Sequence, residues 1–200
     1  MHGWDLEKSP TIPLDGQWEI YPEKLASHQD IQLAENQLRY IQVPGDWSSV
    51  LSKGSSSSFG YGTYRLRILA DPLKQPVSFW FRGLQASSGV EMNGQVEDDI
   101  GKPAENANEY MPKNVSFTAS YDVKGAKEIE LLIRVANFED PYNGGILRSI
   151  GFGSQAAIDY RALVLYRIST RYVYCFADSR SVCLYPLLIQ SSRKSFVHIS

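Results

Sequence analysis

The pair Asn93-Gly94 lies between two short runs in which apolar and polar residues alternate. Both central positions of a two-residue type I′ turn need a positive φ angle, and Asn-Gly is the pair that best tolerates it. The pair therefore predicts a tight β-hairpin. Because similar runs lie on both sides of it, we expect the chain up to residue 155 to be built from antiparallel strands.

Further runs have the alternating or continuously apolar character of strands that bury one face or both. We expect strands at residues 16–21, 39–43, 63–69, 77–82, 115–119, 128–135 and 146–152. The clearest is 128–135, in which every second residue is apolar. Apart from one helical turn expected at residues 22–26, no helical periodicity competes with these strands before residue 155.

About eight short strands at this spacing are typical of two packed antiparallel sheets. We therefore predict an all-β fold, a two-sheet antiparallel jelly-roll sandwich. Its core is expected to bury side chains from several strands, namely Trp18, Ile68, Phe81 and Ile133. The predicted division is a lead-in over residues 1–12, the jelly roll over 13–155 and an irregular or partly helical tail over 156–200.

The tail contains apolar runs that are separated by Arg and Asp residues. A membrane-spanning helix needs about 20 mostly apolar residues, and each charge near its centre costs about 2.5–3.5 kcal/mol. The tail is therefore not expected to span a membrane as an intact helix. Three forms remain open: an added pair of strands, a packed helix, or the remnant of a membrane segment.

Composition excludes several classes of function. The 43% hydrophobic and 12% aromatic content is enough to build a core, so disorder is not expected. A net charge of −2 without a strongly basic run argues against nucleic acid as a partner. The cysteines, Cys175 and Cys183, match no common zinc spacing. We expect neither a metal nor an organic cofactor.

No reactive constellation stands out, so the chain is not expected to be an enzyme. The histidines His2, His28 and His198 have no evident nucleophile beside them. Glycoside hydrolysis needs two facing carboxylates. Carboxylates do gather around the hairpin: Glu91, Glu97, Asp98, Asp99 and Glu105. A solvated acidic loop is the favoured interpretation of this cluster, ahead of a catalytic pair or a calcium site.

Binding a sugar needs less: an aromatic face for the ring and planar polar side chains for the hydroxyls. By type and position, the candidate ligand-binding residues are Trp47, Tyr61, Arg65, Asn137, Tyr142 and Arg148. Each has a structural alternative. Trp47 is equally suited to close the end of the core, the two arginines to pair with carboxylates on strands, and Asn137 to cap a turn.

Several sequence blocks resemble known sugar-binding jelly rolls. Residues 14–19, 43–47 and 60–65, followed by Asn93-Gly94, resemble the sugar-binding domain of family 2 glycoside hydrolases. A closer resemblance is to the galactose-binding-like extracellular domain of bacterial seven-transmembrane receptors with diverse intracellular signalling modules. The blocks that add to it are Ile100-Gly101-Lys102, residues 135–138 and the Gly-Gly-Ile block at 144–150, which ends at Gly153. Together these blocks cover residues 12–155.

The resemblance implies a sensor domain on the extracytoplasmic face of a bacterial membrane, with a carbohydrate-like small molecule as ligand. In that family a signal peptide precedes the domain and seven membrane helices follow it. Residues 1–5 show no such leader, whereas residues 184–189 and the basic flank at 192–196 look like the end of a first membrane span. We therefore expect a truncated or disrupted receptor fragment, linked to a membrane only through this segment.

Two other interpretations remain open. One is a non-catalytic sugar-binding domain of a glycoside hydrolase. The other is a structural or dimerising β-sandwich without a ligand, in which an exposed strand edge pairs with a second copy.

Overall fold

A computed structural model describes residues 10–31, 38–51, 57–73, 75–84, 86–96, 99–122 and 125–175, the last ten by their backbone alone. The strands are β1 Ile12–Pro13, β2 Gly16–Pro22, β3 Arg39–Val43, β4 Gly60–Leu69, β5 Val77–Arg82, β6 Ser87–Met92, β7 Gln95–Val96, β8 Ser116–Tyr121, β9 Glu128–Asn137 and β10 Gly151–Gly153. The helices are α1 His28–Ile31, α2 Ser48–Leu51 and α3 Gln155–Cys175.

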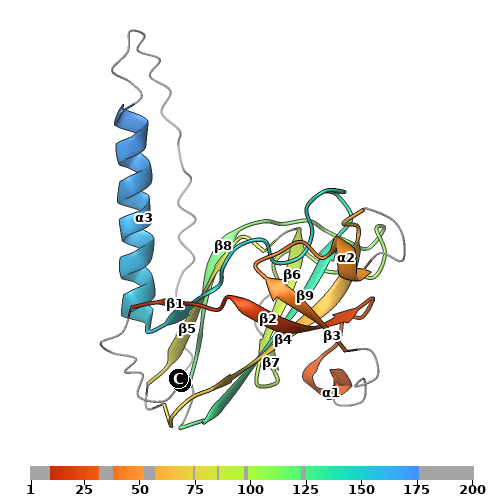
Figure 1. Ribbon diagram of the computed structural model, residues 1–200, viewed down its shortest axis with the longest axis horizontal. Helices are drawn as coiled ribbons and strands as arrows, with labels where there is room; N and C mark the ends of the chain where they lie inside the picture. Colours follow the sequence, from red (N-terminus) through yellow and green to blue (C-terminus); the bar gives the residue numbers. More distant parts are fainter. Residues whose placement is uncertain are drawn as a thin grey trace. The chain divides into compact units, whose positions relative to one another are not determined.

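The strands form two antiparallel sheets, which confirms the prediction of an all-β sandwich (Figure 1). One sheet has the order β1-β10-β5-β8 and the other the order β3-β2-β4-β9-β6-β7. The longest pairing joins β4 to β9, from Gly60 opposite Asn137 to Leu69 opposite Glu128. This pairing places the alternating side chains of both strands in register, so their apolar residues share the inner face of the larger sheet.

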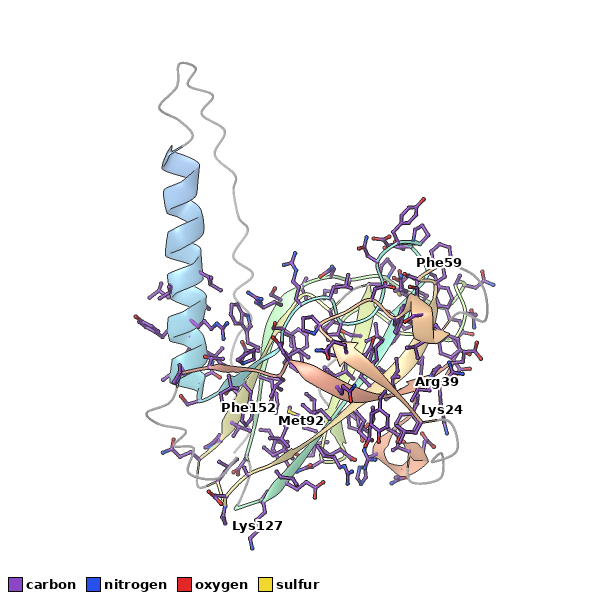
Figure 2. All side chains as sticks on the ribbon, viewed as in Figure 1. Lys24, Arg39, Phe59, Met92, Lys127 and Phe152 are labelled. Carbon is purple, nitrogen blue, oxygen red and sulfur yellow. The ribbon has the colours of Figure 1, made fainter. Side chains whose placement is uncertain are left out.

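The core lies between the sheets. All four residues predicted for it, Trp18, Ile68, Phe81 and Ile133, are at most 4% exposed and belong to one buried cluster. Aromatic rings of the smaller sheet add to the cluster: the centroids of Phe79 and Phe152 lie 5.1 Å apart. Figure 2 shows Met92, from the larger sheet, and Phe152, from the smaller sheet, inside the sandwich.

The Asn93-Gly94 hairpin forms as predicted. Asn93 and Gly94 have φ angles of 47° and 79°, and Met92 pairs with Gln95 across the turn. The Asn93 side chain also anchors the turn to β9, because its Oδ1 accepts a hydrogen bond from the backbone N of Glu130 at 2.7 Å.

Two predicted elements differ from the structure. Residues 22–26 are not helical, because Glu23 takes a positive φ of 55°. The helical turn begins instead at His28. It is capped by Ser27, whose backbone N and Oγ donate hydrogen bonds of 2.9 and 2.7 Å to the Asp30 carboxylate.

The predicted strand at residues 146–152 is also wrong over most of its length, since only Gly151–Gly153 forms β10. Before β10, two backbone carbonyls accept hydrogen bonds from separate segments of the chain. Ile146 O accepts a hydrogen bond from Gly45 N, and Ile150 O accepts one from Leu14 N, both at 2.9 Å. Ile146 and Ile150 are nevertheless fully buried, so the apolar pattern marked core contact rather than strand pairing.

The part of the tail that is described forms the helix α3, not a pair of strands. It begins after Ser154, whose Oγ accepts a hydrogen bond from Ala157 N at 3.2 Å. The chain divides after Ala162 into two units. No helix among the described residues is long and apolar enough to cross a membrane. The segment at 184–196 lies outside the described residues.

Candidate functional site

Trp47 closes the core at the end of the sandwich that carries α2. Its side chain is 0% exposed, its Nε1 donates a hydrogen bond to Ser58 O at 3.0 Å, and its ring stacks on Tyr64 with centroids 6.0 Å apart. A Cβ atom on Gly144 would collide with this ring, so position 144 must be glycine for the loop to pass over Trp47. Trp47 therefore occupies the core position that was its structural alternative, and burial keeps its ring from a ligand in solution.

Asp46, beside Trp47, joins three loop segments. Its carboxylate accepts hydrogen bonds from Ser48 N at 2.7 Å and from Ser58 Oγ and Gly144 N, both at 2.8 Å. Burial alone would raise the pKa of Asp46, but these hydrogen bonds outweigh it and hold the pKa below its ordinary value. The charged carboxylate therefore fixes the loops at this end of the sandwich at neutral pH.

Asn137, at the end of β9, holds the loop that follows it. Its side chain is 0% exposed. The amide nitrogen donates to the carbonyls of Ser58, Asp140 and Asn143 at 2.9, 2.7 and 3.0 Å. Its oxygen accepts from the backbone N of Glu139 and Asp140. The turn-capping interpretation of Asn137 is thus what the structure shows.

Replacing this amide should unlock the loop. Asn137→Ala is expected to lower the free energy of unfolding by about 2 kcal/mol, because it leaves buried backbone carbonyls without donors. Urea denaturation measures the change. Asn108→Ala is the matched control, since Asn108 is exposed and its replacement should cost less than about 0.5 kcal/mol. Equal losses in the two variants would contradict the role given to Asn137.

Arg65 belongs to an ion-pair network on the outer face of the larger sheet. Its guanidinium contacts Glu130 at 2.6 Å and Glu19 at 3.2 Å. His28 Nδ1 contacts the other oxygen of Glu130, and His28 N donates to Glu91 at 3.0 Å. The carboxylate-pairing interpretation of Arg65 is therefore confirmed.

Of the acidic residues predicted to lie in a solvated loop, Asp99 and Glu105 are exposed, as expected, whereas Glu91 is buried. Glu91 is only 3% exposed, and its carboxylate accepts a hydrogen bond from His28 N. Asp99 pairs with Arg134 at 3.4 Å. Glu97 and Asp98 lie outside the described residues. Within the described ranges, no group of three or more His, Cys, Asp or Glu residues could hold a metal ion.

The two candidate tyrosines lie apart. Tyr61 packs against a small apolar cluster of Ala86, Ala104, Tyr110 and Ala136. Tyr142 is 83% exposed and directly precedes Asn143. The six sequence candidates therefore do not converge on one point.

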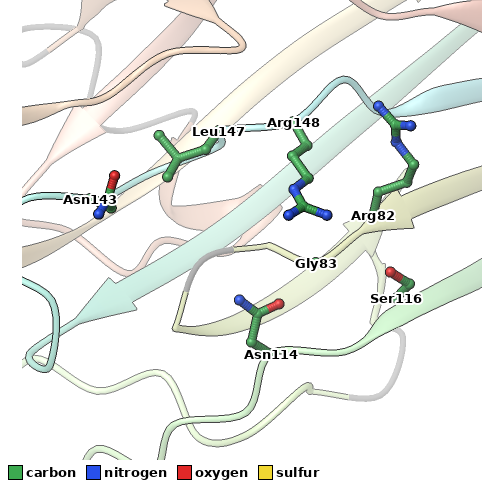
Figure 3. Close-up of a pocket in the computed structure, with 7 residues that line it drawn as sticks. All are labelled: Arg82, Gly83, Asn114, Ser116, Asn143, Leu147 and Arg148. Atoms are coloured by element: carbon green, nitrogen blue, oxygen red, sulfur yellow. The ribbon is translucent and has the colours of Figure 1, made fainter. Parts of the chain in front are cut away.

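A surface cavity of about 430 Å³ lies where β5 ends and β8 begins. We call it the rim pocket, and its lining residues are Arg82, Gly83, Asn114, Ser116, Asn143, Leu147 and Arg148. Figure 3 shows that they come from three chain segments, with Arg148 and Asn114 directed toward each other from opposite sides. Arg148 is the one sequence candidate in this lining.

The floor of the rim pocket requires a glycine. Gly83 has a φ of +70°, which disfavours any residue with a Cβ. A Cβ built there would also lie 2.5 Å from Asn114 Oδ1. The turn after β5 therefore packs closely against the Asn114 amide, and this packing sets the position of the amide in the rim pocket.

A second hollow, of about 340 Å³, shares Asn114 with the rim pocket. Its other lining residues are Ala86, Pro112, Lys113, Asn137, Glu139 and Asp140. It holds two carboxylates and one ammonium group, whereas the rim pocket is lined by two guanidinium groups and no carboxylate. The two neighbouring hollows thus differ in the sign of their charge.

Most residues of the rim pocket are not marked by any pattern in the sequence. Arg82 ends an apolar run and Gly83 follows it, a usual place for a turn. Asn114, Ser116 and Asn143 have the composition of ordinary loops. Only the pairing of β5 with β8, with Arg82 opposite Ser116, shows that the first two segments meet.

Comparison with known proteins finds similarity in structure. No family model and no curated protein matches the chain. A glycosyl hydrolase family 2 member from Bacteroides cellulosilyticus is similar over 72% of this chain, with a TM-score of 0.54 and 19% identity. The beta-glucuronidase of Ruminococcus gnavus is similar over 76%, with a TM-score of 0.54 and 12% identity.

The chain spans only 20% and 30% of the lengths of these two proteins. At such low identity, the likeness establishes a shared fold. It supports the part of the sequence resemblance that concerns the β-sandwich of family 2 glycoside hydrolases, and the resemblance to the receptor domain stays a prediction.

Proposed function

We propose that this chain is a non-catalytic binding domain for a carbohydrate-like small molecule, which it holds in the rim pocket. The observation that carries the proposal is the shape and lining of that pocket. Its volume of about 430 Å³ falls in the usual range for ligand sites, roughly 300–1,000 Å³. The pocket lies on loops that a rigid sandwich supports, which is where binding sites commonly form.

The lining suits a molecule rich in hydroxyl groups. Two amide side chains, Asn114 and Asn143, and the hydroxyl of Ser116 line the pocket, and these group types hydrogen-bond to hydroxyls. The side chain of Leu147 supplies an apolar contact for the C–H groups of a sugar ring. Glycoside hydrolysis requires two facing carboxylates, and none lines this pocket. This chemistry favours binding over catalysis.

Within this function, we propose the role of an extracytoplasmic sensor in a bacterial membrane receptor. The support is the order of the sequence blocks over residues 12–155. The second candidate is an accessory domain of a glycoside hydrolase, which the similarity to family 2 structures favours. Membrane fractionation of the native protein from its own cells separates them, because a receptor sediments with membranes and stays there after a carbonate wash.

Filling the rim pocket should abolish binding. Ser116→Tyr places a bulky ring in it at an exposed position of β8, an edge strand that tolerates aromatic residues. Thr118→Tyr is the matched control, since residue 118 is exposed on the same face of β8 but does not line the pocket. Isothermal titration with neutral and acidic mono- and disaccharides should show binding by the parent chain and Thr118→Tyr, and none by Ser116→Tyr. Equal binding by all three proteins would contradict the assignment.

A further inference from the structure

The arginines of the rim pocket differ from three arginines on the larger sheet. On the outer face of that sheet, each of the three has a carboxylate partner: Arg65 pairs with Glu130, Arg67 with Glu19 and Arg134 with Asp99. Arg82 and Arg148 have no ion pair with any described residue, although the chain has more acidic than basic residues. Arg82 instead lies over the ring of Trp80, 5.5 Å from its centroid.

The carboxylate nearest to the pocket along the chain, that of Asp140, is already engaged. Asp140 accepts hydrogen bonds from Tyr142 N at 2.8 Å, Asn143 N at 3.1 Å and Asn143 Nδ2 at 2.9 Å. These bonds hold the pKa of Asp140 below its ordinary value, and the bond from Tyr142 N contributes most to this lowering. Asp140 lines the second hollow together with Glu139. The positive charge of the rim pocket is therefore not neutralised by its own lining.

The two arginines that line the rim pocket come from different segments. Arg82 stands at the end of β5, and Arg148 lies on the segment that leads to β10. In Figure 3, the side chain of Arg148 extends into the space above Gly83 and faces the amide of Asn114. A guanidinium group in this position presents a planar fork of N–H donors, which matches the two oxygens of a carboxylate.

From this arrangement we propose that the ligand of the rim pocket is a sugar acid, whose carboxylate is bound by Arg148 with a second charge contributed by Arg82. The ring hydroxyls face the amides of Asn114 and Asn143. This proposal rests on the proposed function, because it names the ligand class of the same pocket. It narrows the proposed ligand from any carbohydrate-like molecule to a sugar that carries a negative charge.

Matched sugar pairs test the proposal. Isothermal titration of the full chain compares D-glucuronate with D-glucose and D-galacturonate with D-galactose, at low and at high salt. We expect at least one acid to bind about tenfold or more tightly than its neutral partner, which corresponds to about 1.4 kcal/mol. The preference should shrink as salt screens the charge. A sulfated and a phosphorylated sugar are included to separate a carboxylate from other oxyanions.

Substitutions locate the effect. Arg148→Gln should abolish the preference for the acid, and Arg82→Gln should weaken it. Arg67→Gln is the control, since the Arg67 side chain is 54% exposed on the outer face of the other sheet. Equal affinity for acid and neutral sugars, tighter binding of the sulfated or phosphorylated sugar, or a preference that survives in the Arg82→Gln, Arg148→Gln double variant overturns this inference alone. Binding of no sugar at all overturns the proposed function and, with it, this inference.

Discussion

Replacement of Trp47 by alanine is expected to lower the free energy of unfolding by about 3–5 kcal/mol, the usual cost of removing a large aromatic side chain from a core. The ring is fully buried, stacks on Tyr64 and satisfies the carbonyl of Ser58. Its loss leaves a cavity against the close-packed backbone of Gly144 and Gly145, which has little freedom to collapse into it. Urea or thermal denaturation followed by circular dichroism measures the effect.

Tyr142→Ala is the control for this prediction. Tyr142 is an aromatic residue at the same end of the sandwich, but it is 83% exposed. Its replacement should change the free energy of unfolding by less than about 0.5 kcal/mol. A stable Trp47→Ala protein that no longer binds sugar would contradict the core position of Trp47 and restore it as a ligand contact.

The second large effect is expected at Arg65. Arg65→Met removes the charge that pairs with Glu130 and Glu19, whose side chains are 8% and 15% exposed. Removing one partner of a largely buried pair commonly costs about 3–5 kcal/mol, because the other charge stays buried without compensation. We expect about 3 kcal/mol here, since His28 remains beside Glu130. Methionine keeps the length of the side chain, so the measured loss reports mainly on the charge.

Arg67→Met makes the same chemical change two residues away on β4. The Arg67 side chain is 54% exposed and contacts Glu19 at 3.7 Å, so its loss should cost less than about 1 kcal/mol. Chemical denaturation at pH 7 compares the two variants. Equal and small losses would show that Glu130 does not depend on Arg65 and that solvent reaches this network.

Local residue patterns were sufficient to predict much of the fold. The runs at residues 39–43 and 77–82 were predicted with the bounds that the structure shows for β3 and β5. These strands are set by residue types that favour a pleated and buried surface. The Asn93-Gly94 turn was predictable for a similar reason, because its two positive φ angles are a property of the pair itself. Such features need no knowledge of distant contacts.

The candidate site depends on contacts that no local pattern encodes. Trp47 and Arg65 were suitable ligand residues by type, and only the packing of Gly144 over Trp47 and the register that places Arg65 near Glu130 show that they are structural. Arg82 and Asn114 meet only because β5 pairs with β8. Arg148 was identified from its loop position, yet its surroundings became clear only when the three segments were seen together.

The most direct test of this account follows the backbone amide signals of the full chain by NMR during titration with a sugar acid. The account predicts chemical-shift changes concentrated at the residues that line the rim pocket, in the segments 82–83, 114–116 and 143–148. It also predicts that Ser116→Tyr abolishes these changes. Shifts centred on Tyr61 and its apolar cluster, or no shift with any sugar, would contradict the claim that the rim pocket is a ligand-binding site.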